Sequence, residues 1–142
     1  MKTLKLTLSV ILISIVVASC SKDQEVVKQL ASGTWEVTAM SYNGISLPDS
    51  TFAGDKYTFE KCKVSKGDCS GEYTTTDPTK GDVVTSFTYS ISDKGETISI
   101  TMSLFGIPAS STGDILEHSK DKFVWSSKDV NGDVTETTIE TI

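Results

Sequence analysis

The sequence predicts an all-β protein, an eight-stranded antiparallel up-and-down barrel with a short N-terminal helix, and three observations support this fold class. Apolar and polar residues alternate in short runs along most of the chain, as in strands with one buried face. Turn-forming pairs such as Asn43-Gly44 and Asn131-Gly132 separate the runs. Successive runs start roughly 10 to 15 residues apart, which favours a meander. Closure would remove exposed strand edges, and a β-sandwich of the same strands is the alternative.

Residues 1–19 are typical of a signal peptide. Lys2 and Lys5 precede the aliphatic run from Leu6 to Val17 (LTLSVILISIVV), as a charged region precedes the apolar region of such a leader. The run is about a dozen residues long, whereas a helix needs ~20 residues to cross the hydrocarbon core of a bilayer. We therefore expect a leader that is removed rather than a membrane span.

Cys20 lies three residues after the end of this run and has its own interpretation. The tetrad Val17-Ala18-Ser19-Cys20 resembles the bacterial lipobox, in which signal peptidase II cuts before the cysteine and the sulfur carries a diacylglycerol. Three acyl chains in total, as the resemblance implies, would anchor the protein stably without a spanning helix. We expect residues 20–29 to be the acylated cysteine and a flexible tether, and residues 30–142 to be the folded domain.

The tract Ser21-Lys22-Asp23-Gln24-Glu25 bears on location. It resembles the lysine-plus-acid tract that routes lipoproteins to the cell surface in some Gram-negative lineages. The sequence therefore predicts a lipid-anchored outer-membrane protein exposed at the cell surface. A position facing the periplasm is the alternative.

The charge of the mature chain argues against nucleic-acid partners. The leader contains two lysines and no acid, so its removal takes the formal net charge from −6 to −8. The chain has no arginine, and its acidic surface would be repelled by phosphate backbones. We expect no nucleic-acid partner, while a protein partner stays unknown.

The predicted elements follow in order along the chain. Glu25 to Ala31 is expected to form two helical turns that end at Ser32-Gly33. The third strand begins at Gly71 and closes at Asp77-Pro78. The apolar residues that mark the other strands are Trp35, Val37 and Ala39; Tyr57 and Phe59; Phe87, Tyr89 and Ile91; Ile98, Ile100 and Met102; Ile115 and Leu116; Phe123 and Trp125; and Val134, Ile139 and Ile142.

The segment from Leu104 to Ala109 interrupts this pattern. It is apolar without alternation and contains Pro108, so we expect a loop rather than a strand. Such a loop can lie over the barrel mouth as a lid, expose a patch to a partner or membrane, or pack against the outside of the barrel.

Cys62 and Cys69 are expected to form a structural disulfide. The six residues between them do not match the spacing of zinc ligands, and no second pair is present. They flank Val64-Ser65-Lys66-Gly67, read here as a hairpin loop that would set the two cysteines opposite each other on adjacent strands. Export into an oxidising compartment favours the bond.

Catalytic chemistry has no visible basis in the sequence. His118 is the only histidine, and we find no nucleophile motif, metal-ligand cluster or phosphate-binding glycine loop. We therefore expect no enzyme activity, no catalytic residues, no metal and no cofactor.

The residues also resemble a known family. Gly33-Thr34-Trp35 resembles the lipocalin G-x-W signature, and the stretch from Leu30 to Glu140 looks like the small lipocalin-like domains of bacterial lipoproteins. The resemblance implies that Trp35 plugs one end of the barrel. The sequence departs from lipocalins in lacking the arginine that stacks on this tryptophan and a C-terminal helix.

The large rings are the candidate ligand-binding residues. If they point inward they can line a cavity for one small apolar ligand, or they can fill a narrow barrel completely. The candidates are Trp35, Phe59, Phe87, Tyr89, Phe105, Phe123 and Trp125. Two functions follow: a membrane-anchored lipoprotein that holds a small hydrophobic ligand, or a structural or protein-interaction lipoprotein, such as an inhibitor or accessory subunit, with a filled barrel. A cavity beside Leu104 to Ala109 would favour the first.

Overall fold

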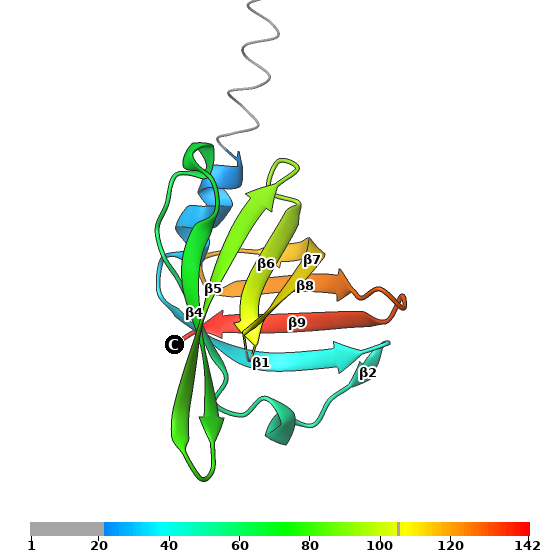
Figure 1. The fold of residues 1–142 in the computed structure, drawn as a ribbon. Coiled ribbons are helices and arrows are strands. Elements are labelled where there is room, and N and C mark those ends of the chain that lie inside the picture. Colours follow the sequence, from blue (N-terminus) through cyan, green and yellow to red (C-terminus); the bar gives the residue numbers. More distant parts are fainter. Residues whose placement is uncertain (1–21, 105) are drawn as a thin grey trace, which may run out of the picture.

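A single antiparallel sheet curls into a closed barrel in the computed structural model, which describes residues 22–104 and 106–142 (Figure 1). The strands are β1 (Thr34–Tyr42), β2 (Ile45–Ser46), β3 (Lys56–Phe59), β4 (Cys69–Asp77), β5 (Gly81–Ser92), β6 (Thr97–Leu104), β7 (Ile107–His118), β8 (Lys122–Lys128) and β9 (Val134–Thr141). Each strand from β3 onward pairs with the next, and β9 returns to pair with β1. Eight strands therefore close the ring, and β2 only extends the edge of β1. The predicted barrel is confirmed over the sandwich.

A helix over residues 22–30 covers one end of the barrel, which we call the closed end (Figure 1). Its Val26, Val27 and Leu30 are at most 1% exposed and belong to the barrel core. The predicted N-terminal helix is confirmed, but the expectation of a flexible tether is wrong for residues 22–29. The tract is polar on average, yet its apolar residues share one helical face, and burial of that face fixes the helix.

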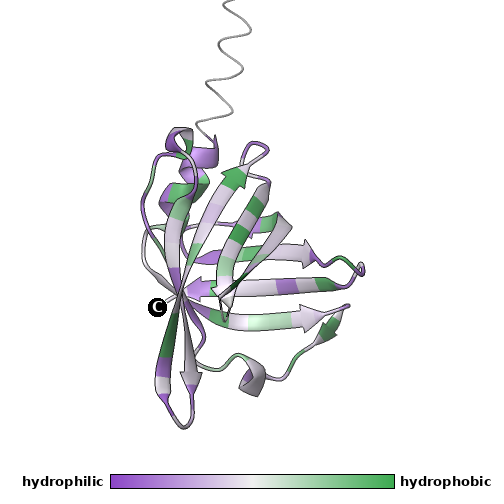
Figure 2. Cartoon of the chain, viewed as in Figure 1, coloured by the Kyte–Doolittle hydropathy of each residue, from purple (hydrophilic) through white to green (hydrophobic). Residues whose placement is uncertain are grey.

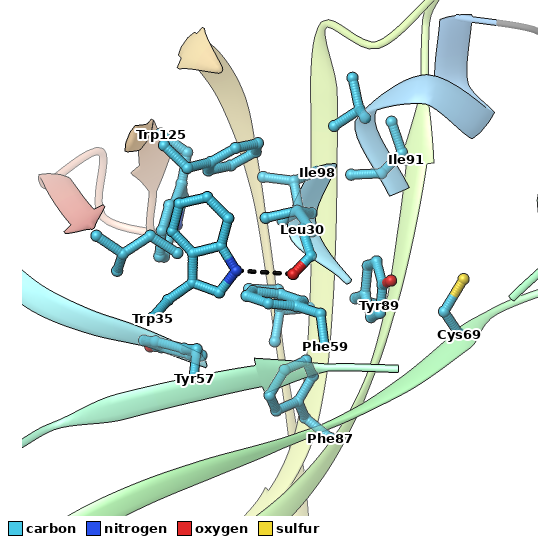
Figure 3. Close-up of a cluster of buried hydrophobic side chains, with 14 of the residues drawn as sticks. Leu30, Trp35, Tyr57, Phe59, Cys69, Phe87, Tyr89, Ile91, Ile98 and Trp125 are labelled. Atoms are coloured by element: carbon cyan, nitrogen blue, oxygen red, sulfur yellow. Dashed lines mark hydrogen bonds between the residues drawn. The ribbon is translucent and has the colours of Figure 1, made fainter. Parts of the chain in front are cut away.

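The inward-facing side chains form one continuous core. Hydrophobic and polar residues alternate along β6 (Figure 2), and the aromatic rings of β1, β3, β5 and β8 meet inside the barrel. The Nε1 of Trp35 donates a hydrogen bond of 2.7 Å to the carbonyl oxygen of Leu30, which fastens the helix to the first strand (Figure 3). Trp35 thus closes this end of the barrel, as the family resemblance implied.

A β-bulge in β1 changes which of its residues face inward. The register with β9 shifts between Val37 and Ala39. Because a bulge inserts one extra residue, the alternation reverses beyond it. Ala39 is exposed and Met40 packs against the core, so the predicted inward position of Ala39 is wrong.

Leu104 and residues 106–109 lie at the tip of the β6–β7 hairpin, and the predicted loop is wrong because residues 107–109 are part of β7. Leu104 pairs with Ile107, and Pro108 lies within β7 opposite Ser103. Residues 107–112 pair only with β6, because pairing of β7 with β8 begins at Gly113. Proline is tolerated there because this stretch of β7 is an edge.

The predicted disulfide joins Cys62 and Cys69, whose Cα atoms are 5.5 Å apart. The predicted hairpin around it is wrong. β3 already ends at Phe59, and Cys62 lies in the β3–β4 loop (residues 60–68), which contains a short 3-10 helix, Val64–Lys66. On the chain-entropy model, closing this loop contributes about 2.5 kcal/mol to stability.

Candidate ligand-binding site

A cavity of about 280 Å³ opens at the end of the barrel opposite the helix. We call this end the mouth. It lies where β1 and β8 finish and where β7 and β9 begin, since these antiparallel strands run from one end of the barrel to the other. The cavity is lined by Met40, Tyr57, Ile100, Met102, Ala109, Ser110, Ser111, Trp125, Ser127, Thr135 and Thr137.

The opening lies where β7 extends past the end of β8, which finishes at Lys128. Gly113 pairs with Ser127, and no pairing with β8 continues toward Ile107. Ala109 and Ser111, in the stretch of β7 that pairs only with β6, border the cavity together with Ser127. The bulge in β1 completes the wall by turning Met40 inward. The cavity therefore depends on two departures from a regular barrel.

Two rings form the inner wall of the cavity. Tyr57 and Trp125 meet edge to face, with ring centroids 5.8 Å apart. Burial raises the pKa of the Tyr57 phenol, and the carboxylate of Asp55 raises it further. The phenol is therefore protonated and uncharged at neutral pH, and it can act as a hydrogen-bond donor.

The lining offers apolar surface and hydroxyl groups but no formal charge. Met40, Ile100, Met102 and the Trp125 ring supply the apolar surface, while serines, threonines and Tyr57 supply hydroxyls. A site of this kind can hold a small uncharged molecule that buries an apolar face and makes a few hydrogen bonds. Its volume is just below the range of about 300–1,000 Å³ that is usual for drug-sized ligands.

The candidate rings divide into two groups. Trp125 lines the mouth cavity, whereas Trp35, Phe59, Phe87, Tyr89 and Phe123 are absent from its lining and are at most 3% exposed. Phe105 lies outside the described residues. The half of the barrel nearest the helix is thus packed with rings, and the mouth cavity lies in the other half.

Tyr89, one of the candidate ligand-binding residues, is already engaged within the fold. Its hydroxyl donates to the carbonyl oxygen of Glu60 at 3.0 Å, and its ring packs edge to face on Phe59, 5.1 Å away. Burial raises the pKa of this phenol, so it stays a neutral donor to the β3–β4 loop. The Tyr89 hydroxyl group therefore stabilises the closed end of the barrel.

Most of the residues that line the cavity are not apparent as site residues from the sequence. The strand pattern marks Tyr57 only as a strand residue. A regular alternation from Trp35 and Val37 would place Met40 on the outer face of β1, because the pattern does not show the bulge. Thr135 and Thr137 looked only like strand-forming residues. The available clue was the alternation in DVTETTIETI, which places Thr135, Thr137 and Ile139 on one face.

Hydrogen bonds at the rim hold the β1–β2 turn against the β8–β9 turn. The Tyr42 hydroxyl and the Asn43 amide donate to opposite oxygens of Asp133, at 2.6 and 2.8 Å. These bonds lower the pKa of the Asp133 carboxyl, the one from Tyr42 having the larger effect. The backbone N–H of Val134 donates to Asn43 Oδ1 at 2.8 Å, so the rim is fixed on this side of the cavity.

No helix within residues 22–104 and 106–142 is both long and apolar enough to cross a membrane. The predicted signal peptide and Cys20 lie outside these residues.

A closed antiparallel barrel with one end filled and covered and the other end hollow places the chain in the class of small β-barrel proteins with an internal cavity. The family model of the lipocalin-like domain matches residues 32–125, well over half of the chain, and the chain belongs to this family. Members of this family are typically binding proteins rather than enzymes. The resemblance to lipocalin-like domains is thereby confirmed.

Solved structures share the fold at low identity. A lipocalin-like protein from Bacteroides uniformis is 17% identical, with 80% of this chain and 99% of that chain covered and a TM-score of 0.57. A redesigned β-barrel is 16% identical, with 82% and 95% covered and a TM-score of 0.55. A redesigned β-barrel bound to DFHBI is 17% identical, with 81% and 97% covered and a TM-score of 0.51. No curated protein matches the sequence.

Proposed function

We propose that the protein is a membrane-anchored lipocalin-like lipoprotein that holds a small, uncharged, largely hydrophobic ligand in the mouth cavity. The observation that carries the proposal is the uncharged cavity bordered by Ala109, Tyr57 and Trp125 in a barrel whose other half is filled. Lipocalin-like barrels are typically binding proteins, and a redesigned barrel of similar fold is bound to DFHBI, which agrees with such a role.

The size of the cavity limits the kind of ligand that it can hold. The rings of Trp35 and Phe123, both 0% exposed, occupy the core toward the helix, so a ligand cannot reach the closed end. A long acyl chain would have to protrude from the mouth into water, where its exposed methylenes would not contribute to affinity. A compact ligand with an apolar ring or short aliphatic body fits better than a fatty acid.

Filling the cavity is expected to abolish most binding. In Ala109→Phe a ring enters the cavity from β7, and we expect affinity for a bound ligand to fall at least about tenfold, because the ligand and the ring compete for one space. The measurement is native mass spectrometry for co-purifying molecules from a soluble form that starts at Ser21, followed by thermal-shift titration with a panel of neutral aromatic and short aliphatic compounds.

Ala39→Phe is the matched control, because Ala39 is also an exposed alanine on a strand but does not line the cavity. It should leave binding unchanged. A clean unliganded mass together with no thermal shift across the panel would refute the ligand-binding proposal.

A protein-interaction role is the second candidate, and the β4–β5 hairpin favours it. Between Thr74 and Phe87, β4 no longer pairs with β3 and β5 does not yet pair with β6. In this part of the hairpin the two strands pair only with each other. It extends away from the barrel (Figure 1) and exposes Val83 and Val84, 42% and 56% of their surface. Exposed apolar residues on a strand with free edges suit contact with a partner protein.

The anchor proposal rests on the leader and the tetrad that ends at Cys20. Cys20→Ala should move the protein from the membrane fraction to the soluble fraction, because the variant lacks the sulfur that would carry the diacylglycerol. Fractionation followed by immunoblotting measures this, and protease treatment of intact cells tests surface exposure. Unchanged partitioning of Cys20→Ala would contradict the anchor.

A further inference from the structure

A second hollow, of about 490 Å³, lies at the closed end of the barrel. We call it the lysine groove. It runs between the N-terminal helix and the β3–β4 loop, and its lining residues are Gln24, Lys28, Lys61, Cys62, Lys63 and Ser65. It is separate from the mouth cavity, with which it shares no residue.

The two walls of the groove are fastened to each other. The Gln24 side chain donates from Nε2 to the Cys62 carbonyl oxygen at 2.8 Å and accepts at Oε1 from the Val64 N–H at 3.2 Å. The disulfide ties the same loop to the start of β4. Asp23 accepts a 2.6 Å hydrogen bond from the Gly95 N–H, which fixes the helix to the β5–β6 turn as well. The groove is thus preorganised rather than a gap between loose segments.

The charge of the groove is opposite to that of the chain. Lys28, Lys61 and Lys63 are its only charged lining residues, in a protein whose formal net charge is −6. In the part of the chain that the structure describes, ion pairs occur at Lys120–Asp121 and Lys122–Glu117, and none involves these three lysines. Three exposed, unpaired ammonium groups around one hollow attract an anion.

The position of the groove suggests where that anion comes from. Lys22 begins the helix that forms one wall, and Cys20 precedes it by two residues. Two residues span at most about 7 Å, so an acyl group on Cys20 would hold the closed end at the membrane surface. The mouth cavity, at the opposite end, would then face away from the membrane.

We propose that the lysine groove binds the phosphate groups of anionic lipids in the membrane that anchors the chain. The membrane position in this inference rests on the proposed acylation of Cys20. The attraction of the three lysines for phosphate groups does not depend on it. Lysine stems and the disulfide offer apolar surface beside the ammonium groups, which suits the boundary between headgroups and acyl chains. Barrel orientation then follows from two contacts, the acyl anchor and the groove.

The test uses the soluble form that starts at Ser21, so that its outcome does not depend on acylation. Co-sedimentation with phosphatidylglycerol–phosphatidylcholine vesicles at low salt should show binding that phosphatidylcholine vesicles alone do not support. The triple variant Lys28→Gln, Lys61→Gln and Lys63→Gln should lose about 100-fold in affinity, from roughly fivefold per lysine near an anionic surface.

The control is Lys56→Gln, Lys80→Gln and Lys128→Gln, which makes the same change in net charge on strands and turns outside the groove. It should reduce affinity only slightly. Equal losses in the two triple variants, or equal binding to both kinds of vesicle, would overturn the proposal. Failure of Cys20→Ala to change partitioning would instead contradict the anchor and leave this result unaffected.

Discussion

Trp35→Ala is expected to lower the free energy of unfolding by about 3–5 kcal/mol, the usual cost of removing a large buried ring. Trp35 is 0% exposed, and its ring lies in the core where the first strand meets the helix. The cavity left by the indole would be bounded by other rings that already pack in the barrel (Figure 3) and cannot all move to fill it. Equilibrium unfolding in urea, followed by far-ultraviolet circular dichroism, gives the value.

Trp35→Phe separates packing from hydrogen bonding at the same position. Phenylalanine keeps an apolar ring but removes the donor to the Leu30 carbonyl oxygen, and leaving that buried acceptor unpaired should cost about 1–3 kcal/mol. In both variants the amides of Val26 and Val27 should exchange faster, because the helix loses its link to β1. An alanine variant within about 1 kcal/mol of the natural protein would show that the helix covers the barrel without this tryptophan.

The fold was predictable because its strands follow the alternation that burial of one face requires. Phe87, Tyr89 and Ile91 on β5 point inward as expected, and Ile98 and Ile100 do so on β6. In a closed barrel every strand shows the same alternation of inward and outward residues, since all strands surround a single interior. The register was less predictable, because one inserted residue reverses every position after it. The β1 bulge moved Ala39 out and Met40 in for this reason.

The sequence predicted a candidate site inside the barrel, but it did not predict where in the barrel the cavity lies. Large rings in the sequence pointed to the barrel interior, yet whether a ring fills space or borders a cavity depends on where neighbouring strands separate. That separation is a tertiary property, set here by the end of β7–β8 pairing at Gly113. The order of the helix over residues 22–30 could not be predicted for a related reason. The helix is stabilised by burial of Val26, Val27 and Leu30 against the end of the barrel. The local sequence does not show that such a surface is available.

Gly113→Ala is expected to destabilise the protein by about 3 kcal/mol or more, at the upper end of overpacking effects. A Cβ at Gly113 would collide with the Ser126 carbonyl oxygen and would lie 2.9 Å from the Ser126 carbonyl carbon and 3.1 Å from Ser127 Cα. All three atoms belong to the β8 backbone, so no side-chain rotation relieves the contact. The strands would have to separate where their pairing begins.

Gly33→Ala is the matched control for this prediction, because a Cβ at Gly33 would have no atom within 4 Å apart from those of Gly33 and its two chain neighbours. Its effect on the free energy of unfolding should stay within about 0.5 kcal/mol, as for other open sites. Gly33 is also the glycine of the G-x-W motif, so a large loss there would mean that the motif needs glycine for a reason other than space. If both variants unfold at the same urea concentration as the natural protein, β7 and β8 tolerate a wider spacing, and Gly113 does not set the edge of the mouth cavity.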